Sequence, residues 1–169
     1  LAQVGYHMRF REPARRLRAL LDSGEAGAPT LFQGRYWANF RANPWWRDPA
    51  MSGGQMREQA IHLIDLALFF LGKPVAASGH LANLGHRDQP DYRVEDTGVG
   101  LVHFEGGAAA TISCSNCALP DRFIGDYRVV ATRALLDYRT TGDWRDTDQA
   151  TLHCAGRAEE IPAKANAYA

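Results

Sequence analysis

The stretch GGQMREQAIHLID, residues 53–65, decides how this sequence is interpreted, because two glycines open a strongly apolar segment that carries few polar side chains. At about 100° per residue, Glu58, His62 and Asp65 fall on one narrow face of the helix that this spacing predicts over 53–71. Burial can tune the proton affinities of a carboxylate and an imidazole one turn apart, which favours acid/base chemistry. The alternative is an ordinary core histidine, with Glu58 capping the helix or solvated.

The composition predicts a soluble, single-domain protein. A length of 169 residues suits one core of ordinary size, and 19 basic side chains balance 19 acidic ones. This scattered, balanced charge argues against a nucleic-acid or membrane-surface partner, and the longest apolar run, residues 66–71, is too short to span a bilayer. The first ten residues lack the pattern of a secretion signal, so we expect a cytoplasmic location.

The three cysteines argue against a disulfide framework. Cys114 and Cys117 form a C-x2-C pair, but they lie in an alternating, strand-like stretch in which residues three apart point to opposite faces. No second cysteine pair or histidine cluster lies near them in the sequence. We therefore expect no metal site here and interpret both as small buried or half-buried residues.

The order of the expected elements predicts an α+β fold. A strand-like segment over 2–6 and a helix over 11–23 precede a strand over 30–38, an aromatic-rich loop over 39–52 and the helix over 53–71. The rest is β in character, with a polar, mobile loop over 85–95 and strands over 75–84, 97–104, 108–116, 126–132, 134–138, 151–155 and 159–161. Helices would then cover one face of an open, mainly antiparallel sheet.

The opposite face of that sheet needs a cover of its own. Alternating side chains on it are apolar or small: Val99, Leu101, His103, Ala109, Thr111 and Ser113. A chain of this size usually buries such a face against another subunit or another domain.

Several short motifs follow one another along nearly the whole chain: Val4-Gly5-Tyr6 with Arg9-Phe10, Leu21-Asp22-Ser23-Gly24, Gly53-Gly54 through Asp65, Leu71-Gly72-Lys73-Pro74, Glu95-Asp96-Thr97 and Phe104-Glu105-Gly106-Gly107. In this order and spacing, the chain resembles the C-terminal domain of the Gfo/Idh/MocA family of NAD(P)-dependent sugar, polyol and inositol dehydrogenases. The resemblance implies that residues 1–28 are the end of a Rossmann domain with its linking helix. Residues 29–169 would then be an α+β domain for substrate binding and dimerisation.

The family's helix signature is Gly-Gly followed by Asp and His, each after three residues, and it matches Gly53, Gly54, Glu58 and His62 with Glu in place of Asp. The resemblance implies that His62 exchanges a proton with the reacting hydroxyl or carbonyl, and that Glu58 orients it or binds substrate. The extra methylene of Glu moves the charge by roughly a bond length, which can change the substrate or the activity. Asp65 matches an acidic residue of the family, and we interpret it as a structural hydrogen-bonding group near the site.

The resemblance also implies NAD or NADP as cofactor, bound mainly by an N-terminal Rossmann domain. No Gly-x-Gly-x-x-Gly turn follows a strand in these residues, and the two lysines are Lys73 and Lys164. We therefore expect a fragment of a longer oxidoreductase that acts on a sugar, polyol or inositol-like hydroxyl carbon and forms a homo-oligomer through the open sheet face. The alternatives are a catalytically silent member that senses a ligand or supports assembly, and a sheet domain for association alone.

Further candidates precede the Gly-Gly helix. Trp45, Trp46 and Arg47 could contact substrate or cofactor, with a protein interface as the alternative. Arg35 and Tyr36 could line the same cleft, or they could be ordinary sheet-face residues. The other histidines are interpreted as structural or solvated: His7, His80, His86, His103 and His153.

Overall fold

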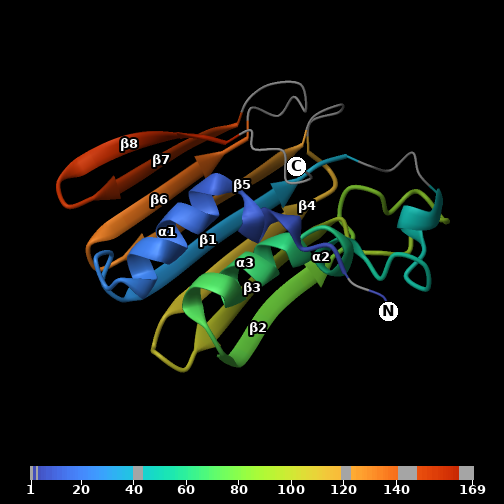
Figure 1. The fold of residues 1–169 in the computed structure, drawn as a ribbon. Helices are drawn as coiled ribbons and strands as arrows, with labels where there is room; N and C mark the ends of the chain where they lie inside the picture. The colour runs from blue at the N-terminus through green and yellow to red at the C-terminus, as the bar shows by residue number, and fades with distance from the viewer. Residues whose placement is uncertain (1, 3, 40–43, 119–122, 141–147, 164–169) are drawn as a thin grey trace.

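One eight-stranded sheet organises the protein, seen in a computed structural model that describes residues 2, 4–39, 44–118, 123–140 and 148–163. The strand order is β2-β3-β4-β1-β5-β6-β7-β8, and β1 runs parallel to β4 while the other neighbours are antiparallel. The strands are β1 (Pro29–Trp37), β2 (Pro74–Ala82), β3 (Thr97–Phe104), β4 (Ala109–Ser115), β5 (Ile124–Ala131), β6 (Ala134–Arg139), β7 (Gln149–Cys154) and β8 (Arg157–Pro162). The predicted open, mainly antiparallel α+β fold is confirmed (Figure 1).

Two longer helices, α1 (Glu12–Asp22) and α3 (Ile61–Leu71), lie on one face of the sheet (Figure 1). α3 packs against β1 and β4, and α1 packs against β6, β7 and β8. Short helical segments accompany them: η1 (His7–Phe10), η2 (Pro44–Arg47) and α2 (Gln55–Glu58). None of the helices within the described ranges is long and apolar enough to cross a membrane.

The N-terminal segment differs from the prediction of a strand over 2–6. Its described residues form tight turns, in which the Tyr6 N–H donates to Val4 O at 3.1 Å and the His7 N–H donates to Gly5 O at 3.0 Å. These local bonds use the donors that a sheet ladder would need, and the 3-10 helix η1 follows directly. The segment therefore crosses the helical layer instead of joining the sheet.

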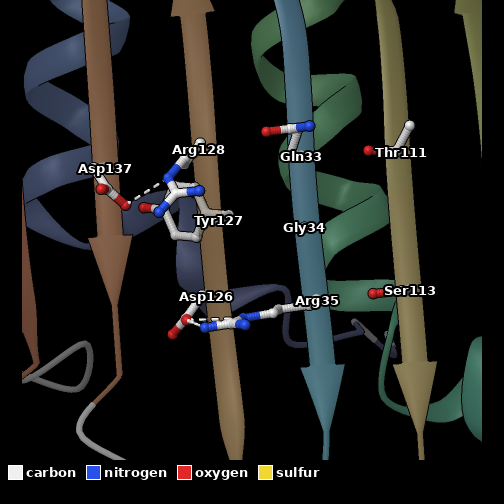
Figure 2. Close-up of a pocket in the computed structure, with 9 residues that line it drawn as sticks. All are labelled: Gln33, Gly34, Arg35, Thr111, Ser113, Asp126, Tyr127, Arg128 and Asp137. Atoms are coloured by element: carbon white, nitrogen blue, oxygen red, sulfur yellow. Dashed lines mark hydrogen bonds and ion pairs between the residues drawn. The ribbon is translucent and has the colours of Figure 1, made fainter.

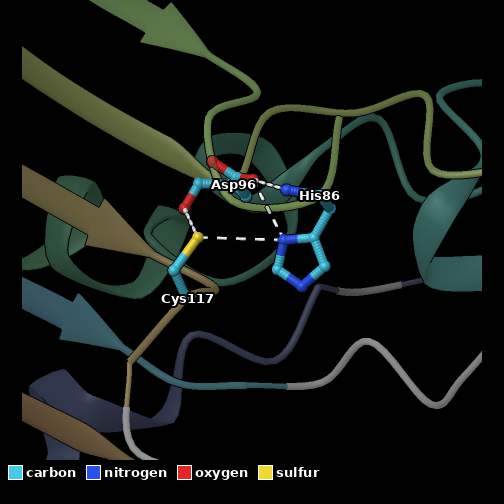
Figure 3. Close-up of side chains that lie close together, drawn as sticks. All are labelled: His86, Asp96 and Cys117. Carbon is cyan, nitrogen blue, oxygen red and sulfur yellow. Dashed lines mark hydrogen bonds and ion pairs between the residues drawn. The ribbon is translucent and has the colours of Figure 1, made fainter. Parts of the chain in front are cut away.

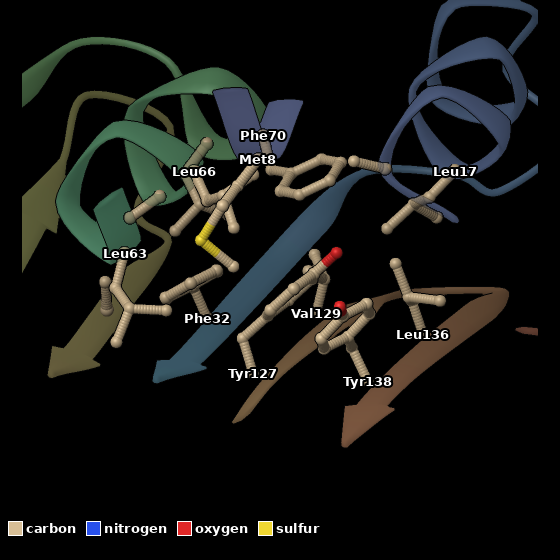
Figure 4. Close-up of a cluster of buried hydrophobic side chains, with 14 of the residues drawn as sticks. Met8, Leu17, Phe32, Leu63, Leu66, Phe70, Tyr127, Val129, Leu136 and Tyr138 are labelled. Atoms are coloured by element: carbon tan, nitrogen blue, oxygen red, sulfur yellow. The ribbon is translucent and has the colours of Figure 1, made fainter. Parts of the chain in front are cut away.

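The hydrophobic core lies between the sheet and the two helices. Large side chains from both layers meet there with almost no exposure, as Figure 4 shows for Met8, Leu17, Phe32, Leu63, Leu66, Phe70, Tyr127, Val129, Leu136 and Tyr138. Across the strands the rings stack in a row, with Phe32 and Tyr127 centroids 5.9 Å apart and Tyr127 and Tyr138 centroids 4.7 Å apart. Each such aromatic contact adds roughly 0.5–1.5 kcal/mol to the burial of the rings.

The helix predicted over 53–71 is in fact two helices, because the regular helical hydrogen bonding is interrupted at Gln59 and Ala60, although both residues keep right-handed helical backbone angles. The Ala60 N–H reaches back five residues to Gln55 O at 3.1 Å, and this wide turn separates α2 from α3. The Gln55 side chain forms two hydrogen bonds at this turn: its Nε2 donates to Ser115 O at 2.8 Å and to Gln59 Oε1 at 3.2 Å. Glu58 and His62 therefore lie on different helices, and the prediction of one continuous helix is wrong.

The other face of the sheet carries no helix, as Figure 1 shows. In the β3–β4 register, Val99 pairs with Ser113, Leu101 with Thr111 and His103 with Ala109, so the six alternating residues share this face as predicted. On β3, the second strand from one edge, Val99 is 50% exposed. We call this surface the open face.

Candidate functional site

The turn before α2 needs both of its glycines. Gly53 and Gly54 have φ values of 77° and 91°, a region that other residues rarely adopt. A Cβ on Gly54 would lie 2.0 Å from Glu95 Oε2, and the other oxygen of Glu95 accepts the Met56 N–H at 2.8 Å. The Glu95 carboxylate thus caps the N-terminus of α2 from a distant loop, and it sets the position of the short helix that carries Glu58.

His62 lies at the start of α3, against aromatic rings of the N-terminal segment. The His7 ring centroid is 5.1 Å away and the Tyr6 centroid 6.4 Å away, both in edge-on geometry. Burial lowers the pKa of His62, and the neighbouring His7 and Arg11 lower it further, while Asp65 acts in the opposite direction. The imidazole is therefore neutral at physiological pH and can accept a proton.

Glu58 is half-buried on α2, and burial raises the pKa of its carboxyl group. Tyr36 on β1 lies close enough to interact with this carboxylate, and burial together with Glu58 raises the pKa of Tyr36 to about 12, against the opposing charge of Arg11. Glu58 Oε2 and His62 Nδ1 are both buried without a hydrogen-bond partner among the described residues. The two atoms therefore do not bond each other, and each is free to bind a further polar group.

Asp65 has a structural partner. Both of its carboxylate oxygens accept hydrogen bonds from the Arg9 guanidinium of η1, one of them at 2.9 Å from Nε. The Arg9 guanidinium also lies over the Phe69 ring, 5.2 Å from its centroid. This geometry fits the interpretation of Asp65 as a structural group, since it fastens η1, and with it Tyr6 and His7, to α3.

The loop with Trp45, Trp46 and Arg47 is fastened to a different part of the chain. Arg47 forms an ion pair with Asp91, and Arg93 reaches back to Asp48 at 2.8 Å, so the two loops exchange ion pairs. In addition, the Arg93 N–H donates to Arg47 O at 2.9 Å. On its other side, Trp46 O accepts the Ser52 hydroxyl at 3.0 Å, and Ser52 Oγ accepts the Gly54 N–H at 3.1 Å, so the segment adjoins the Gly-Gly turn.

The loop between β2 and β3, predicted to be mobile, is held in place by many hydrogen bonds. Asn83 Nδ2 donates to Tyr92 O at 3.1 Å, and the Asp96 carboxylate accepts three backbone N–H groups. His86, interpreted from the sequence as solvated or structural, is only 3% exposed inside this loop, so it is not solvated. The loop therefore supports the segments that flank the Gly-Gly turn.

Arg35 and Tyr36 separate to opposite faces of β1. Arg35 lies on the open face, where its Nε donates to Asp126 at 3.0 Å and its guanidinium lies 4.7 Å from the Trp37 ring centroid. Tyr36 points to the helical side, near Glu58. Because successive strand residues alternate in direction, the prediction that both line one cleft is wrong for Arg35.

A polar pocket of about 240 Å³ lies on the open face around Arg35 (Figure 2). Its walls carry two ion pairs, Arg35 with Asp126 and Arg128 with Asp137, beside the side chains of Gln33, Thr111 and Ser113. The sheet itself separates this pocket from the helical side on which His62 and Glu58 lie.

Tyr6, His7 and Arg11 are the neighbours of His62 that the sequence did not predict. They lie about fifty residues before it, and no helical spacing links them to it. Arg11 is itself held by the Tyr138 hydroxyl and by Asp148, 3.1 Å away. The available signal was the cluster of aromatic and basic residues in the N-terminal segment.

A further group could hold a metal ion, since ligand atoms of His86, Asp96 and Cys117 lie within 4.8 Å of one another. Cys114, the other cysteine of the C-x2-C pair, is buried at the edge of the core, and burial raises its pKa to about 12. Cys117 lies beyond the end of β4 and is exposed, so the prediction of a buried or half-buried strand residue is confirmed for Cys114 and wrong for Cys117.

Comparison with known proteins gives a consistent result. A family model described as the GFO/IDH/MocA C-terminal domain matches residues 14–137. An uncharacterized oxidoreductase of Bacillus subtilis strain 168, YrbE, is 29% identical over 121 residues, which cover 69% of this chain and 34% of that protein.

Solved structures share the fold at low sequence identity. Levoglucosan dehydrogenase in complex with NADH and levoglucosan superposes with a TM-score of 0.79 at 16% identity, covering 96% of this chain and 47% of that one. An NAD binding oxidoreductase from Klebsiella pneumoniae gives a TM-score of 0.73 at 18% identity, covering 94% of this chain and 46% of that one. The chain thus spans between a third and a half of the length of these proteins.

Proposed function

Because this chain belongs to the GFO/IDH/MocA family through its C-terminal domain, we propose that it is the substrate-binding and proton-transfer part of an NAD(P)-dependent oxidoreductase. The substrate would be a sugar, polyol or inositol-like compound that is oxidised or reduced at a hydroxyl-bearing carbon. Members of the same fold whose names state a sugar ligand, such as levoglucosan dehydrogenase, support this substrate class.

One observation carries the proposal: His62 Nδ1 and Glu58 Oε2 are buried without hydrogen-bond partners in the described part of the chain. Leaving a buried polar group unsatisfied costs roughly 1–3 kcal/mol, so native proteins rarely keep two in the same region without a use for them. A ligand with two or more hydroxyl groups would satisfy both atoms. These two atoms belong to Glu58 and His62, the residues that occupy the Asp and His positions of the Gly-Gly helix signature.

The proton chemistry follows from the surroundings of His62. Its imidazole, kept neutral by burial and by the positive charge of Arg11, accepts the proton of the reacting hydroxyl in the oxidation direction and returns it in the reduction direction. Glu58 would accept a hydrogen bond from a second hydroxyl and so orient the substrate. Tyr36, whose hydroxyl stays protonated up to high pH, can donate a hydrogen bond on the same side of β1.

The cofactor would supply or receive the hydride at the substrate carbon when it is bound. Within the described ranges, no glycine-rich turn joins a strand to the N-terminus of a helix in the way that dinucleotide binding requires. The dinucleotide is therefore assigned to a domain outside these residues. This chain contributes the polar groups that face the substrate.

The proposal is tested by His62→Asn in the natural protein that contains this chain, with the exposed His80→Asn as the matched control. We expect kcat for polyol or sugar oxidation to fall by about a hundredfold in the His62 variant and to stay unchanged in the control. Circular dichroism confirms that both variants are folded. A His62 variant with normal kcat would remove the proton-transfer assignment.

The open face would serve as the subunit interface of a homo-oligomer. Four of its charged groups, Arg35, Asp126, Arg128 and Asp137, already form ion pairs within the sheet, so a second subunit could cover them without leaving them unpaired. Val99 offers exposed apolar surface on the same face. An interface of this kind buries more than about 1,000 Å². The alternative is a catalytically silent member of the family that supports assembly, and the Glu found at position 58 in place of the signature Asp favours it.

A further inference from the structure

A second group of reactive side chains lies away from His62, where the loop between β2 and β3 meets the end of β4 (Figure 3). His86 and Asp96 come from this loop, and Cys117 follows β4. His86 Nδ1 is 3.0 Å from Asp96 Oδ2 and 3.8 Å from Cys117 Sγ. Three different ligand-forming atoms thus converge on one point, although they come from positions up to 31 residues apart.

The Asp96 carboxylate is held rigidly. Its Oδ1 accepts the Leu84 N–H at 2.9 Å and the Thr97 hydroxyl at 3.0 Å, and its Oδ2 accepts the N–H groups of Gly85 and His86 at 2.8 and 3.1 Å. The side chain is fully buried, and these four donors fix the direction in which Oδ2 points. Such support from surrounding hydrogen bonds is typical of carboxylates that bind metal ions.

The His86 ring and the Cys117 thiol are positioned as well. The ring stacks on Tyr92 with centroids 4.4 Å apart, and Asn116 Nδ2 donates to the Tyr92 hydroxyl at 2.7 Å. The Gly85 backbone closes over the thiol, because a Cβ there would lie 2.5 Å from Cys117 Sγ. All three groups are therefore held toward one another before any ligand arrives.

The spacing matches the requirements of a small, thiophilic divalent cation. With bond lengths of about 2.0–2.3 Å, the ligand atoms around a tetrahedral zinc ion lie roughly 3.3–3.7 Å apart. The two distances from His86 Nδ1, 3.0 and 3.8 Å, need changes of only a few tenths of an ångström, and the carboxylate and thiol lie within 4.8 Å of each other. Imidazole, carboxylate and thiolate together suit zinc and cobalt, and the thiolate disfavours magnesium and calcium. Cys117 is exposed, which leaves an entry path and room for a water ligand.

We propose that His86 Nδ1, Asp96 Oδ2 and Cys117 Sγ form a binding site for one zinc-like divalent cation, with water as the fourth ligand. On binding, the thiol releases its proton to solvent, and the imidazole proton that bridges Nδ1 to Asp96 is carried on Nε2 instead. The carboxylate and thiolate then balance the two positive charges of the ion.

A cation at this site would join the end of β4 to the loop that supports the candidate active site. The same loop provides Glu95, which caps α2, and Asp91 and Arg93, which pair with Arg47 and Asp48. The ion would therefore have a structural role, stabilising the loop without contact with substrate. This inference does not depend on the proposed redox function.

The experiment titrates the fully reduced, metal-free chain with Co²⁺, which reports a cysteine ligand through its thiolate-to-cobalt absorption band. We expect saturation at one equivalent, displacement of the band by Zn²⁺, and a rise in Tm on adding Zn²⁺. Cys117→Ser should abolish the band and lower the affinity at least tenfold. Cys154→Ser, which changes a partly exposed cysteine outside the group, should leave both unchanged.

Three results would overturn the proposal. The first is the absence of a saturable cobalt band, and the second is a band that persists in Cys117→Ser. The third is a band that disappears in Cys154→Ser. Circular dichroism of the metal-free variants shows whether the fold is retained, and Cys117→Ala serves as a second variant if the serine change perturbs it. Any of these results would leave the Asp96–His86 hydrogen bond as a purely structural link.

Discussion

Gly54 lies directly against the Glu95 carboxylate, so closely that a Cβ on Gly54 would be 2.0 Å from Glu95 Oε2. Forty-one positions separate the two residues, and their contact places the N-terminus of α2. A second glycine, Gly24, has a similar φ of 78° but has nothing within 4 Å of a Cβ. Comparing alanine substitutions at Gly54 and Gly24 therefore separates the cost of backbone strain from the cost of displacing the Glu95 carboxylate.

Gly54→Ala should destabilise the protein by about 2–3 kcal/mol, because it adds backbone strain and pushes away the carboxylate that caps α2. Gly24→Ala should cost only about 1 kcal/mol, from the left-handed backbone alone. Urea unfolding followed by circular dichroism measures both changes. Equal losses in the two variants would mean that the Glu95 contact adds nothing.

Asp65→Asn should reduce the free energy of unfolding by about 1–3 kcal/mol, because it weakens two hydrogen bonds to a charged guanidinium at a site where Asp65 is only 6% exposed. The exposed pair of Arg18 and Asp22 provides the control, and Asp22→Asn should cost less than about 0.5 kcal/mol. Chemical denaturation distinguishes the two. A loss at Asp65 as small as that at Asp22 would contradict the anchoring role of the Arg9–Asp65 pair.

Glu58→Gln should stabilise the fold at neutral pH. Burial raises the pKa of Glu58 above its usual value of 4.5, so the folded state favours the protonated carboxyl group. At low pH the group is protonated in both states, but as the pH rises through the raised pKa the buried group must ionise, and the folded state loses stability relative to the unfolded state. Glutamine does not ionise, so Tm should be higher than in the unmodified protein at pH 7, and the difference should vanish below about pH 4.5.

The control for this prediction is the exposed Glu25→Gln, which should leave Tm unchanged at both pH values. If Glu58→Gln raises Tm equally at low and neutral pH, its effect does not come from ionisation. Substrate oxidation should fall in the same variant, because the amide replaces the carboxylate that is proposed to accept a hydrogen bond from the substrate. A gain in stability with a loss of activity is typical of sites adapted to bind a ligand.

Val99→Asp should convert the proposed oligomer into a monomer, because a charge on the apolar β3 part of the open face would have to be buried in the interface. Leu81→Asp is the matched control, since Leu81 is 54% exposed but lies one strand away, next to the Val99 partner His80, and points to the other side of β2. Analytical ultracentrifugation at micromolar concentration reads out the result. An unmodified chain that sediments only as an 18.7 kDa monomer would refute the proposed interface.

The local pattern of the sequence determined most of the elements. The spacing of Ala14, Leu17 and Leu21 predicted a helix over 11–23, and it forms over 12–22. The strands predicted after residue 74 all end within two residues of their observed bounds. Such patterns are decided by neighbours along the chain, because the periods of helices and strands are properties of the backbone. The same patterns predicted which side chains share the open face.

Tertiary structure alone decided the arrangements that bring distant segments together. Nothing in the spacing of residues 53–71 showed that Gln55 would bond to Ser115 and that the helix would break before α3. The sequence likewise could not place His7 beside His62, or His86 and Asp96 beside Cys117, since these contacts depend on how turns and loops close. Backbone periodicity extends over a few residues, whereas these sites exist only once the sheet has brought its loops together.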